Sequence, residues 1–158
     1  LRALDRPNII PFEQLEQRVE FRFADMNAIP DELLGYDFCW SSCALEHLGS
    51  LDNGLRFIED SLRTLRSGGY AVHTTEFNLT SNDATLESSS LSLYRKRDFE
   101  AVASRLTAAG HHVFPLNFHP GGKTVDQHID LPPYALPHLK LELAQYVTTS
   151  FGLVVRKG

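Results

Sequence analysis

Residues 36–48 read YDFCWSSCALEHL, and they decide how the rest of the chain is interpreted. The first six of these residues form a short, mostly apolar run without alternation, which predicts a strand covered on both faces. From the end of this run onward the segment carries two serines, a cysteine, a glutamate and a histidine, at positions 41, 42, 43, 46 and 47. Such residues occur in nucleophilic sites, in metal sites and in the walls of small-molecule pockets. The neighbouring elements must distinguish these alternatives.

Four further segments have the pattern of strands. Residues 19–24 (VEFRFA) alternate apolar and polar side chains with the period of two that a half-buried strand requires. β-branched and aromatic residues mark three later segments, 70–78, 111–118 and 146–157. The last two are joined without a helix between them, so we expect the final strand to run antiparallel to the others.

Helices are predicted over 53–66 and 97–110, where apolar residues recur at helical intervals, and a short one is predicted just before residue 19. The expected caps are Ser50 or Asp52 for the first and Asp98 for the second, and the expected stops are Gly68-Gly69 and Gly110. The polar segment 79–92 predicts a loop. Alternating strands and helices predict a mostly parallel α/β sheet of about five strands, in a single domain over residues 1–158.

Composition excludes several classes of protein. With 158 residues, 42% hydrophobic and 22% charged, the chain fits one soluble globular domain. Its net charge is −5 and its one basic cluster is Arg95-Lys96-Arg97, so we expect no nucleic-acid partner. No apolar run is long enough to cross a membrane. Cys39 and Cys43 lack a second cysteine pair for zinc or disulfides, which favours a reducing, cytoplasmic location.

Three segments carry a family pattern: FRFADMNAIP (21–30), YDFCWSSCALEHL (36–48) and LRTLRSGGYAVHT (62–74). They resemble, in order, the third strand with its terminal acid, the fourth strand with its turn, and the element before strand five of class I S-adenosylmethionine (SAM) dependent methyltransferases. Ser67 stands where that family usually has proline. The predicted closing strands are similar to the family's terminal β-hairpin. The resemblance implies a Rossmann-like fold that binds SAM and transfers its methyl group.

The sequence departs from this family in its cofactor motif. The family holds SAM with a Gly-rich turn after strand one and an acid at the end of strand two, and neither element is found here. The first glycine is Gly35, and Gly121-Gly122 lie in a late loop. The chain also begins at Leu1 and has its single methionine at position 26. We therefore expect a C-terminal fragment of a methyltransferase domain, inactive alone, that binds SAM weakly or not at all.

The resemblance assigns roles to seven residues. The cofactor-binding set is Asp25 and Met26 for adenine, with Ser41 and Ser42 for the methionine end, and the acceptor-side catalytic set is His47, His73 and Glu76. Three of these residues also have a simpler, structural interpretation. Asp25 suits a turn, His47 can fasten the turn that it belongs to, and His73 can be a buried, satisfied histidine. Cys43 shares a helical face with His47 at a spacing of four, yet it is expected to be a small buried hydrophobe rather than a nucleophile or ligand.

Other functions remain open. The chain could be a non-catalytic α/β subunit that lacks the cofactor half. A metal-dependent hydrolase would use the late loop, where His119, Asp126, His128 and Asp130 have metal-ligating side chains without a recognisable zinc spacing. For a methyltransferase, a small molecule, a sugar or a protein could be the acceptor. An unpaired sheet edge would also allow a homodimer.

Overall fold

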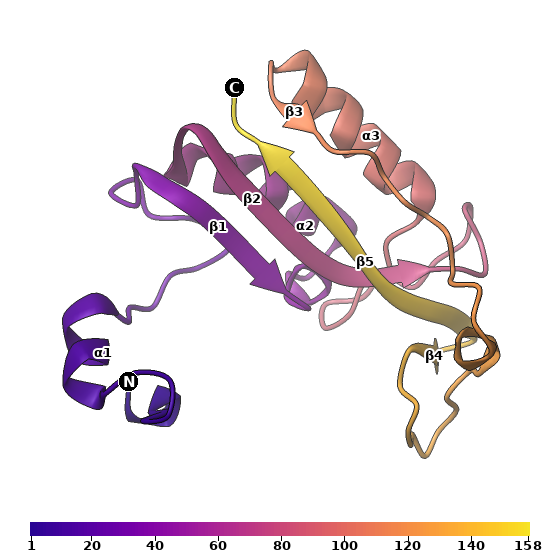
Figure 1. The fold of residues 1–158 in the computed structure, drawn as a ribbon. Coiled ribbons are helices and arrows are strands. Elements are labelled where there is room, and N and C mark those ends of the chain that lie inside the picture. Colours follow the sequence, from indigo (N-terminus) through magenta and orange to yellow (C-terminus); the bar gives the residue numbers. More distant parts are fainter.

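The computed structural model covers residues 1–158 and contains one five-stranded sheet (Figure 1). The strands are β1 (Tyr36–Ser42), β2 (Leu65–Asn78), β3 (His112–Val113), β4 (Lys140–Leu143) and β5 (Tyr146–Arg156). The helices are α1 (Phe12–Arg18), α2 (Leu51–Ser61) and α3 (Lys96–Ala108). The helices α2 and α3 pack on one face of the sheet, whereas α1 stands apart and buries none of its residues. None of these helices has the length and apolar character needed to cross a membrane.

The strands pair in the order β1-β2-β5-β3, and β4 pairs with β5 beside this path. Only β1 and β2 are parallel, and the other three pairings are antiparallel. The sheet has five strands as predicted, although β4 was not among the predicted ones, and the antiparallel final strand is confirmed. The prediction of a mostly parallel sheet is wrong. The reason is that β5 lies between β2 and β3, so it separates two strands that run in the same direction.

The predicted strand over 19–24 does not form. This segment has no ladder partner, and the side chains of Phe21 and Phe23 are 69% and 93% exposed. The pairing nearest to it is an isolated bridge between Asp25 and Ala28. A strand needs a neighbour to satisfy its backbone N–H and C=O groups. Alternation in the sequence shows which residues could share a face, but it provides no such neighbour.

The hydrophobic core lies between the sheet and the two helices. Its members include Leu55 and Ile58 of α2, Val102 of α3, and Phe151 and Leu153 of β5. The opposite face of the sheet has no helical layer. Consequently Phe38 and Trp40 of β1 are 53% and 69% exposed, and the prediction that β1 is covered on both faces is wrong.

The predicted start of α2 is confirmed, but its predicted end is not. Ser50 caps the helix, because its Oγ accepts a hydrogen bond from the Asn53 N–H at 3.1 Å. The helix ends well before Gly68-Gly69, however, and a 3-10 turn over Leu62–Thr64 leads directly into β2. Gly68, with a φ of +79°, lies within β2 where its register with β1 shifts. There the glycine forms an irregular stretch of strand and not a helix stop.

The predicted ends of α3 have a similar outcome. Gly110, with a φ of +90°, follows the helix as expected. Asp98 is the third helical residue rather than the cap, and its Oδ2 accepts hydrogen bonds from the Arg95 N–H and guanidinium, both at 2.8 Å. The strand that follows is much shorter than the predicted 111–118. The ladder ends after the Phe114 N–H donates to the Val154 carbonyl, because Pro115 has no N–H to continue it.

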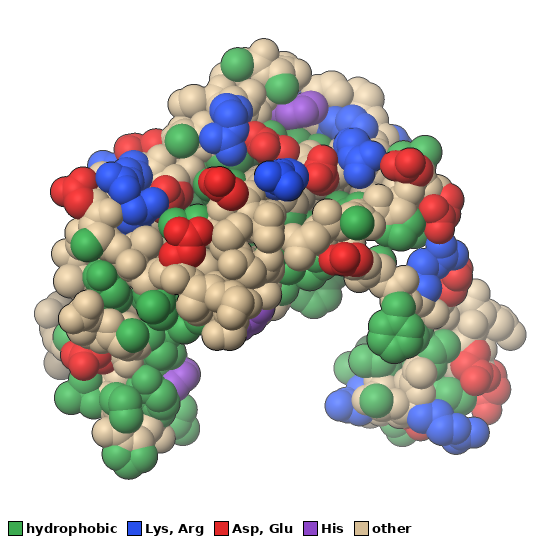
Figure 2. Space-filling view, turned by 180° about the vertical axis from the view of Figure 1, so that it is seen from behind, with side chains coloured by type: hydrophobic (Ala, Val, Ile, Leu, Met, Phe, Trp, Pro, Cys, Tyr) green, Lys and Arg blue, Asp and Glu red, His purple; other side chains and the backbone are tan.

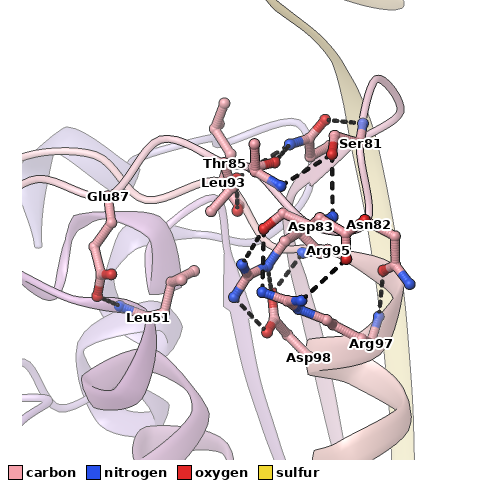
Figure 3. A network of polar contacts seen from close by, with 12 residues as sticks. Leu51, Ser81, Asn82, Asp83, Thr85, Glu87, Leu93, Arg95, Arg97 and Asp98 are labelled. Carbon is pink, nitrogen blue, oxygen red and sulfur yellow. Dashed lines mark hydrogen bonds and ion pairs between the residues drawn. The ribbon is translucent and has the colours of Figure 1, made fainter.

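The polar loop between β2 and α3 is held by many hydrogen bonds (Figure 3). The Asp83 carbonyl accepts from the guanidinium groups of Arg95 and Arg97, at 2.8 and 3.1 Å. At the other end, Glu87 Oε1 accepts the Leu51 N–H at 2.9 Å, at the start of α2. The loop predicted from composition is therefore a defined connection between the starts of α2 and α3. Figure 2 shows this side of the molecule, where acidic and basic side chains are interspersed.

The close contact between α2 and the buried Tyr94 gives a test of the packing. A methyl group on Gly54 would collide with the Tyr94 hydroxyl, which donates a hydrogen bond to the Leu45 carbonyl at 3.0 Å. We expect Gly54→Ala to lower the free energy of unfolding by about 2 kcal/mol, despite the better helix propensity of alanine. Urea denaturation measures this change.

Tyr94→Phe provides the control for this collision. Alone it loses one buried hydrogen bond, worth about 1 kcal/mol. In the double variant with Gly54→Ala the shortest contact, to the hydroxyl, is gone, while the Leu45 carbonyl still lies 2.9 Å from the added methyl group, so the loss should be smaller than the sum of the two single losses without disappearing. Strictly additive losses would show that this contact does not limit the packing.

Candidate functional site

The carboxyl ends of β1 and β2 bring together Cys43, Glu46 and Glu76. One ligand atom from each of these side chains lies within 4.8 Å of the other two. Glu46, in a 3-10 turn over Leu45–His47, is only 2% exposed, and its Oε2 accepts a hydrogen bond from Thr75 Oγ1 at 2.7 Å. Two carboxylates and a thiol thus meet at one edge of the sheet. The sequence pattern assigned Glu76 to this region but gave Glu46 no chemical role.

Glu76 is in an unfavourable environment for a charge. Its Oε2 is buried and has no hydrogen-bond partner. Burial raises the pKa of Glu76 above its ordinary value, and the Glu46 carboxylate raises it further, while Thr148, His138 and His47 act in the opposite direction. A carboxyl group with a raised pKa can take up and release protons closer to neutral pH.

The structure corrects the interpretation of Cys43. This residue has a φ of +46° and an exposed side chain, so it is not a buried hydrophobe. Its N–H still donates to the Thr74 carbonyl at 3.0 Å, and the left-handed conformation then turns the chain away from the sheet. The 3-10 turn begins only at Leu45, so Cys43 and His47 do not share a helical face as their spacing suggested.

His47 contacts the polar loop. Its Nδ1 lies 2.6 Å from the Ser90 carbonyl, which requires the proton to be on Nδ1 and makes the ring the donor. The same segment is joined to the loop again through the Ser92 N–H, which donates to the Glu46 carbonyl at 2.8 Å. This geometry matches the simpler interpretation, in which His47 fastens the turn, and it leaves Nε2 without a protein partner.

His73 lies between two serines on the helix side of the sheet. Ser61 Oγ donates to the Ile58 carbonyl, so His73 Nε2–H donates to Ser61 Oγ at 3.2 Å and Nδ1 accepts from Ser41 Oγ at 2.8 Å. The ring is fully buried, and burial lowers the pKa of His73 to about 4. His73 is therefore a neutral, satisfied core histidine with no solvent access for an acceptor.

Ser41 and Ser42 point to opposite faces of the sheet. Ser41 bonds to His73 on the helix side, whereas Ser42 accepts a hydrogen bond from Thr74 Oγ1 at 3.3 Å on the open side. Successive residues of a strand alternate in this way. The two serines therefore cannot contact one ligand group with both side chains.

Asp25 and Met26 lie in a separate, mostly apolar pocket of about 310 Å³ along β1. The other residues of its wall are Ala24, Ile29, Leu33, Tyr36, Phe38, Cys39, Trp40, Phe57, Ser61 and Thr64. Asp25 Oδ1 accepts the Asn27 N–H at 2.8 Å, which is the turn geometry that its sequence suggested. Its Oδ2 has no partner within the protein. The carboxylate thus holds its own turn and keeps one oxygen available to a ligand.

The late loop does not assemble the metal site of a hydrolase. His119 Nδ1 accepts the Gly121 N–H at 3.1 Å, and Asp126 Oδ2 accepts the Lys123 N–H at 2.7 Å. Asp130 instead pairs with His138, whose Nδ1 lies 2.6 Å from Asp130 Oδ2. His119 and Asp126 are thus used in local turns and Asp130 pairs with His138, and none of these residues belongs to the one ligand cluster of this structure.

This combination of sheet order and site position defines the class of fold. An antiparallel strand lies between β2 and β3, and the polar residues gather beyond the carboxyl ends of the two parallel strands. The fold resembles that of the class I SAM-dependent methyltransferases.

Comparison with solved structures supports this assignment. Similar chains include the [4+2]-cyclase SpnF (TM-score 0.51, 20% identity, 70% of this chain and 38% of that one). An O-methyltransferase family protein from Burkholderia thailandensis has a TM-score of 0.51 at 14% identity, over 96% of this chain and 40% of that one. The third is described as a SAM-dependent methyltransferase from Listeria monocytogenes, with a TM-score of 0.50 at 12% identity, over 93% and 75% of the two chains.

The extent of these similarities limits what they establish. No protein-family model and no curated protein matches the sequence. The chain spans about two fifths of the length of the first two structures, 38% and 40%. At 12–20% identity, the likeness establishes the fold and not the reaction.

The buried position of His73 predicts a specific pH dependence. Its folded pKa of about 4 lies below the ordinary value of 6.5, so the unfolded chain binds the proton more readily. The stabilisation by His73 is thus complete above pH 6.5 and is lost as the pH falls toward 4, by about 3 kcal/mol in total. We expect urea denaturation to show that His73→Gln removes this part of the pH dependence.

His128→Gln is the matched control, because His128 is exposed. It should retain most of the wild-type loss of stability between pH 6.5 and 4. If His73→Gln also retains the full loss of stability between pH 6.5 and 4, then His73 is accessible to protons in the folded chain.

Proposed function

We propose that this chain forms the adenine-contacting and acceptor-side part of a SAM-dependent methyltransferase. The observation that carries the proposal is the apolar pocket along β1, in which Asp25 presents a free carboxylate oxygen beside Met26. An adenine ring needs such apolar walls and a hydrogen-bond acceptor for its amino group. Bound SAM would supply an electrophilic methyl group on sulfur.

The residues present fit only one end of this cofactor. Trp40 and Met26 offer flat or polarisable apolar surface for a purine, and Asp25 offers the acceptor. The ribose and the methionine end would need a Gly-rich turn and a second acid, and neither is found in this sequence. Ser41 is also committed to His73, which leaves Ser42 as the serine available near the end of β1.

On the acceptor side, Glu76 is the residue suited to receive a proton. It lies at the sheet edge beside Glu46, and its raised pKa makes it a stronger base than an ordinary glutamate. Proton removal is required only when the acceptor is a hydroxyl, amine or thiol. His47 would border this site through its free Nε2, while His73 acts from the core by holding Ser41. A small molecule, a sugar or a protein side chain would each satisfy these conditions.

Adenine recognition can be followed with two built-in probes. Met26 is the only methionine and Trp40 the only tryptophan of the chain, and both lie in the pocket wall. We expect adenosine to shift the Met26 methyl resonance and to quench the Trp40 fluorescence, with a dissociation constant on the order of 1 mM because only the adenine end is held. Inosine, which has a carbonyl in place of the amino group, should bind about fivefold more weakly.

Asp25→Ala should weaken adenosine binding to the level of inosine and so remove the discrimination. Asp31→Ala is the matched control, since Asp31 is an exposed acid outside the pocket wall. Equal binding of the two nucleosides to the unmodified chain would contradict the contact between Asp25 and adenine. No response of either probe to adenosine would favour the non-catalytic subunit.

A further inference from the structure

We infer that Cys43, Glu46 and Glu76 form a binding site for a divalent transition-metal ion, with zinc as the best match. Their ligand atoms converge within 4.8 Å of one another, and they come from the end of β1, the following turn and β2. The proposal does not require that the chain transfers methyl groups, but zinc would occupy the Glu76 carboxyl group that is proposed above as the proton acceptor. The site is also distinct from the late loop, whose histidine and acidic residues do not converge.

Buried polar atoms around this cluster lack partners. Only three buried side-chain oxygens of the structure have no hydrogen bond: Glu76 Oε2, Ser92 Oγ and Thr148 Oγ1. Ser92 and Thr148 are both fully buried. Thr148 lies beside the Glu76 carboxyl and favours its charged form, while Ser92 bonds to the Glu46 backbone. A buried carboxylate oxygen without a hydrogen bond is costly, so the unpaired Glu76 Oε2 within the cluster points to a ligand at this position.

The charges of the cluster also favour a cation. Glu46 is buried and Glu76 is half-buried, and their negative charges lie close enough to repel each other. No lysine or arginine side chain is paired with either glutamate. A divalent ion would neutralise both carboxylates at once, which Thr75 cannot do by donating one hydrogen bond to Glu46.

The donor set favours zinc over magnesium or calcium. One thiolate with two carboxylates provides sulfur and oxygen ligands, whereas Mg²⁺ and Ca²⁺ prefer oxygen alone. Three protein ligands would leave a fourth tetrahedral position open, as in catalytic rather than structural zinc sites. Because Cys43 binds as the thiolate, its S–H bond is broken and the proton passes to solvent as the metal–sulfur bond forms. The exposed side chain of Cys43 gives the ion a route of entry.

Cobalt substitution tests this site in the full chain. After treatment with a chelator, we expect Co²⁺ to bind with a thiolate-to-metal charge-transfer band, and Zn²⁺ to displace it at one equivalent with release of protons to the buffer. Cys43→Ser should remove the band. Cys39→Ser is the matched control, because it changes the other free thiol outside the cluster, and it should leave the band unchanged.

The carboxylates are tested by calorimetric titration with Zn²⁺. Glu76→Gln should weaken zinc binding at least tenfold. Glu46→Gln, which can still accept the hydrogen bond from Thr75, should do the same if Glu76→Gln fails to fold. Absence of stoichiometric zinc binding, or cobalt binding without a thiolate band, would overturn the proposal. The same holds if binding is equal in Glu76→Gln and the unmodified chain.

Discussion

The antiparallel pairing of β5 with β2 is the constraint on which the rest of the structure depends. Nine residue pairs join the two strands, from Tyr70 with Arg156 to Asn78 with Thr148. This register turns Phe151 and Leu153 toward the helices and places Thr148 beside Glu76. A slip by one residue would reverse the faces of β5, so the core and the polar edge would be lost together. β3 and β4 also pair only with β5.

Periodicity in the sequence was sufficient to place several helices and strands along the chain. The apolar stripes of α2 and α3, the run in β1 and the β-branched end of the chain all formed close to their predicted positions. Periodicity did not give strand direction, because β5 inserts between two strands that are distant in the sequence. It also could not reveal that 19–24 lacks a pairing partner or that Pro115 ends the ladder of β3.

The surroundings of a single site residue could be predicted only where the conformation of its backbone could be predicted. His47 and His73 are the same residue type, yet one lies in an exposed turn and the other between two serines in the core. That difference depends on which face of β2 carries residue 73, and this follows from the register. The burial of Cys43 was predicted wrongly, because its exposure follows from the left-handed backbone of the turn. The type of side chain does not reveal that conformation. Glu46 belonged to the family pattern in 36–48, but its proximity to Glu76 of β2 followed only from the structure.

β1 connects the two candidate regions physically. Its residues alternate, so Ser41 holds His73 under the helices while Phe38 and Trp40 remain on the open face beside the pocket. Where the strand ends, Cys43 leaves the sheet toward Glu46 and Glu76. The same fold occurs in a [4+2]-cyclase and in methyltransferases, so the scaffold alone does not determine the reaction. In this chain two carboxylates and a thiol converge beyond the end of β1, and a separate apolar pocket lies along the same strand.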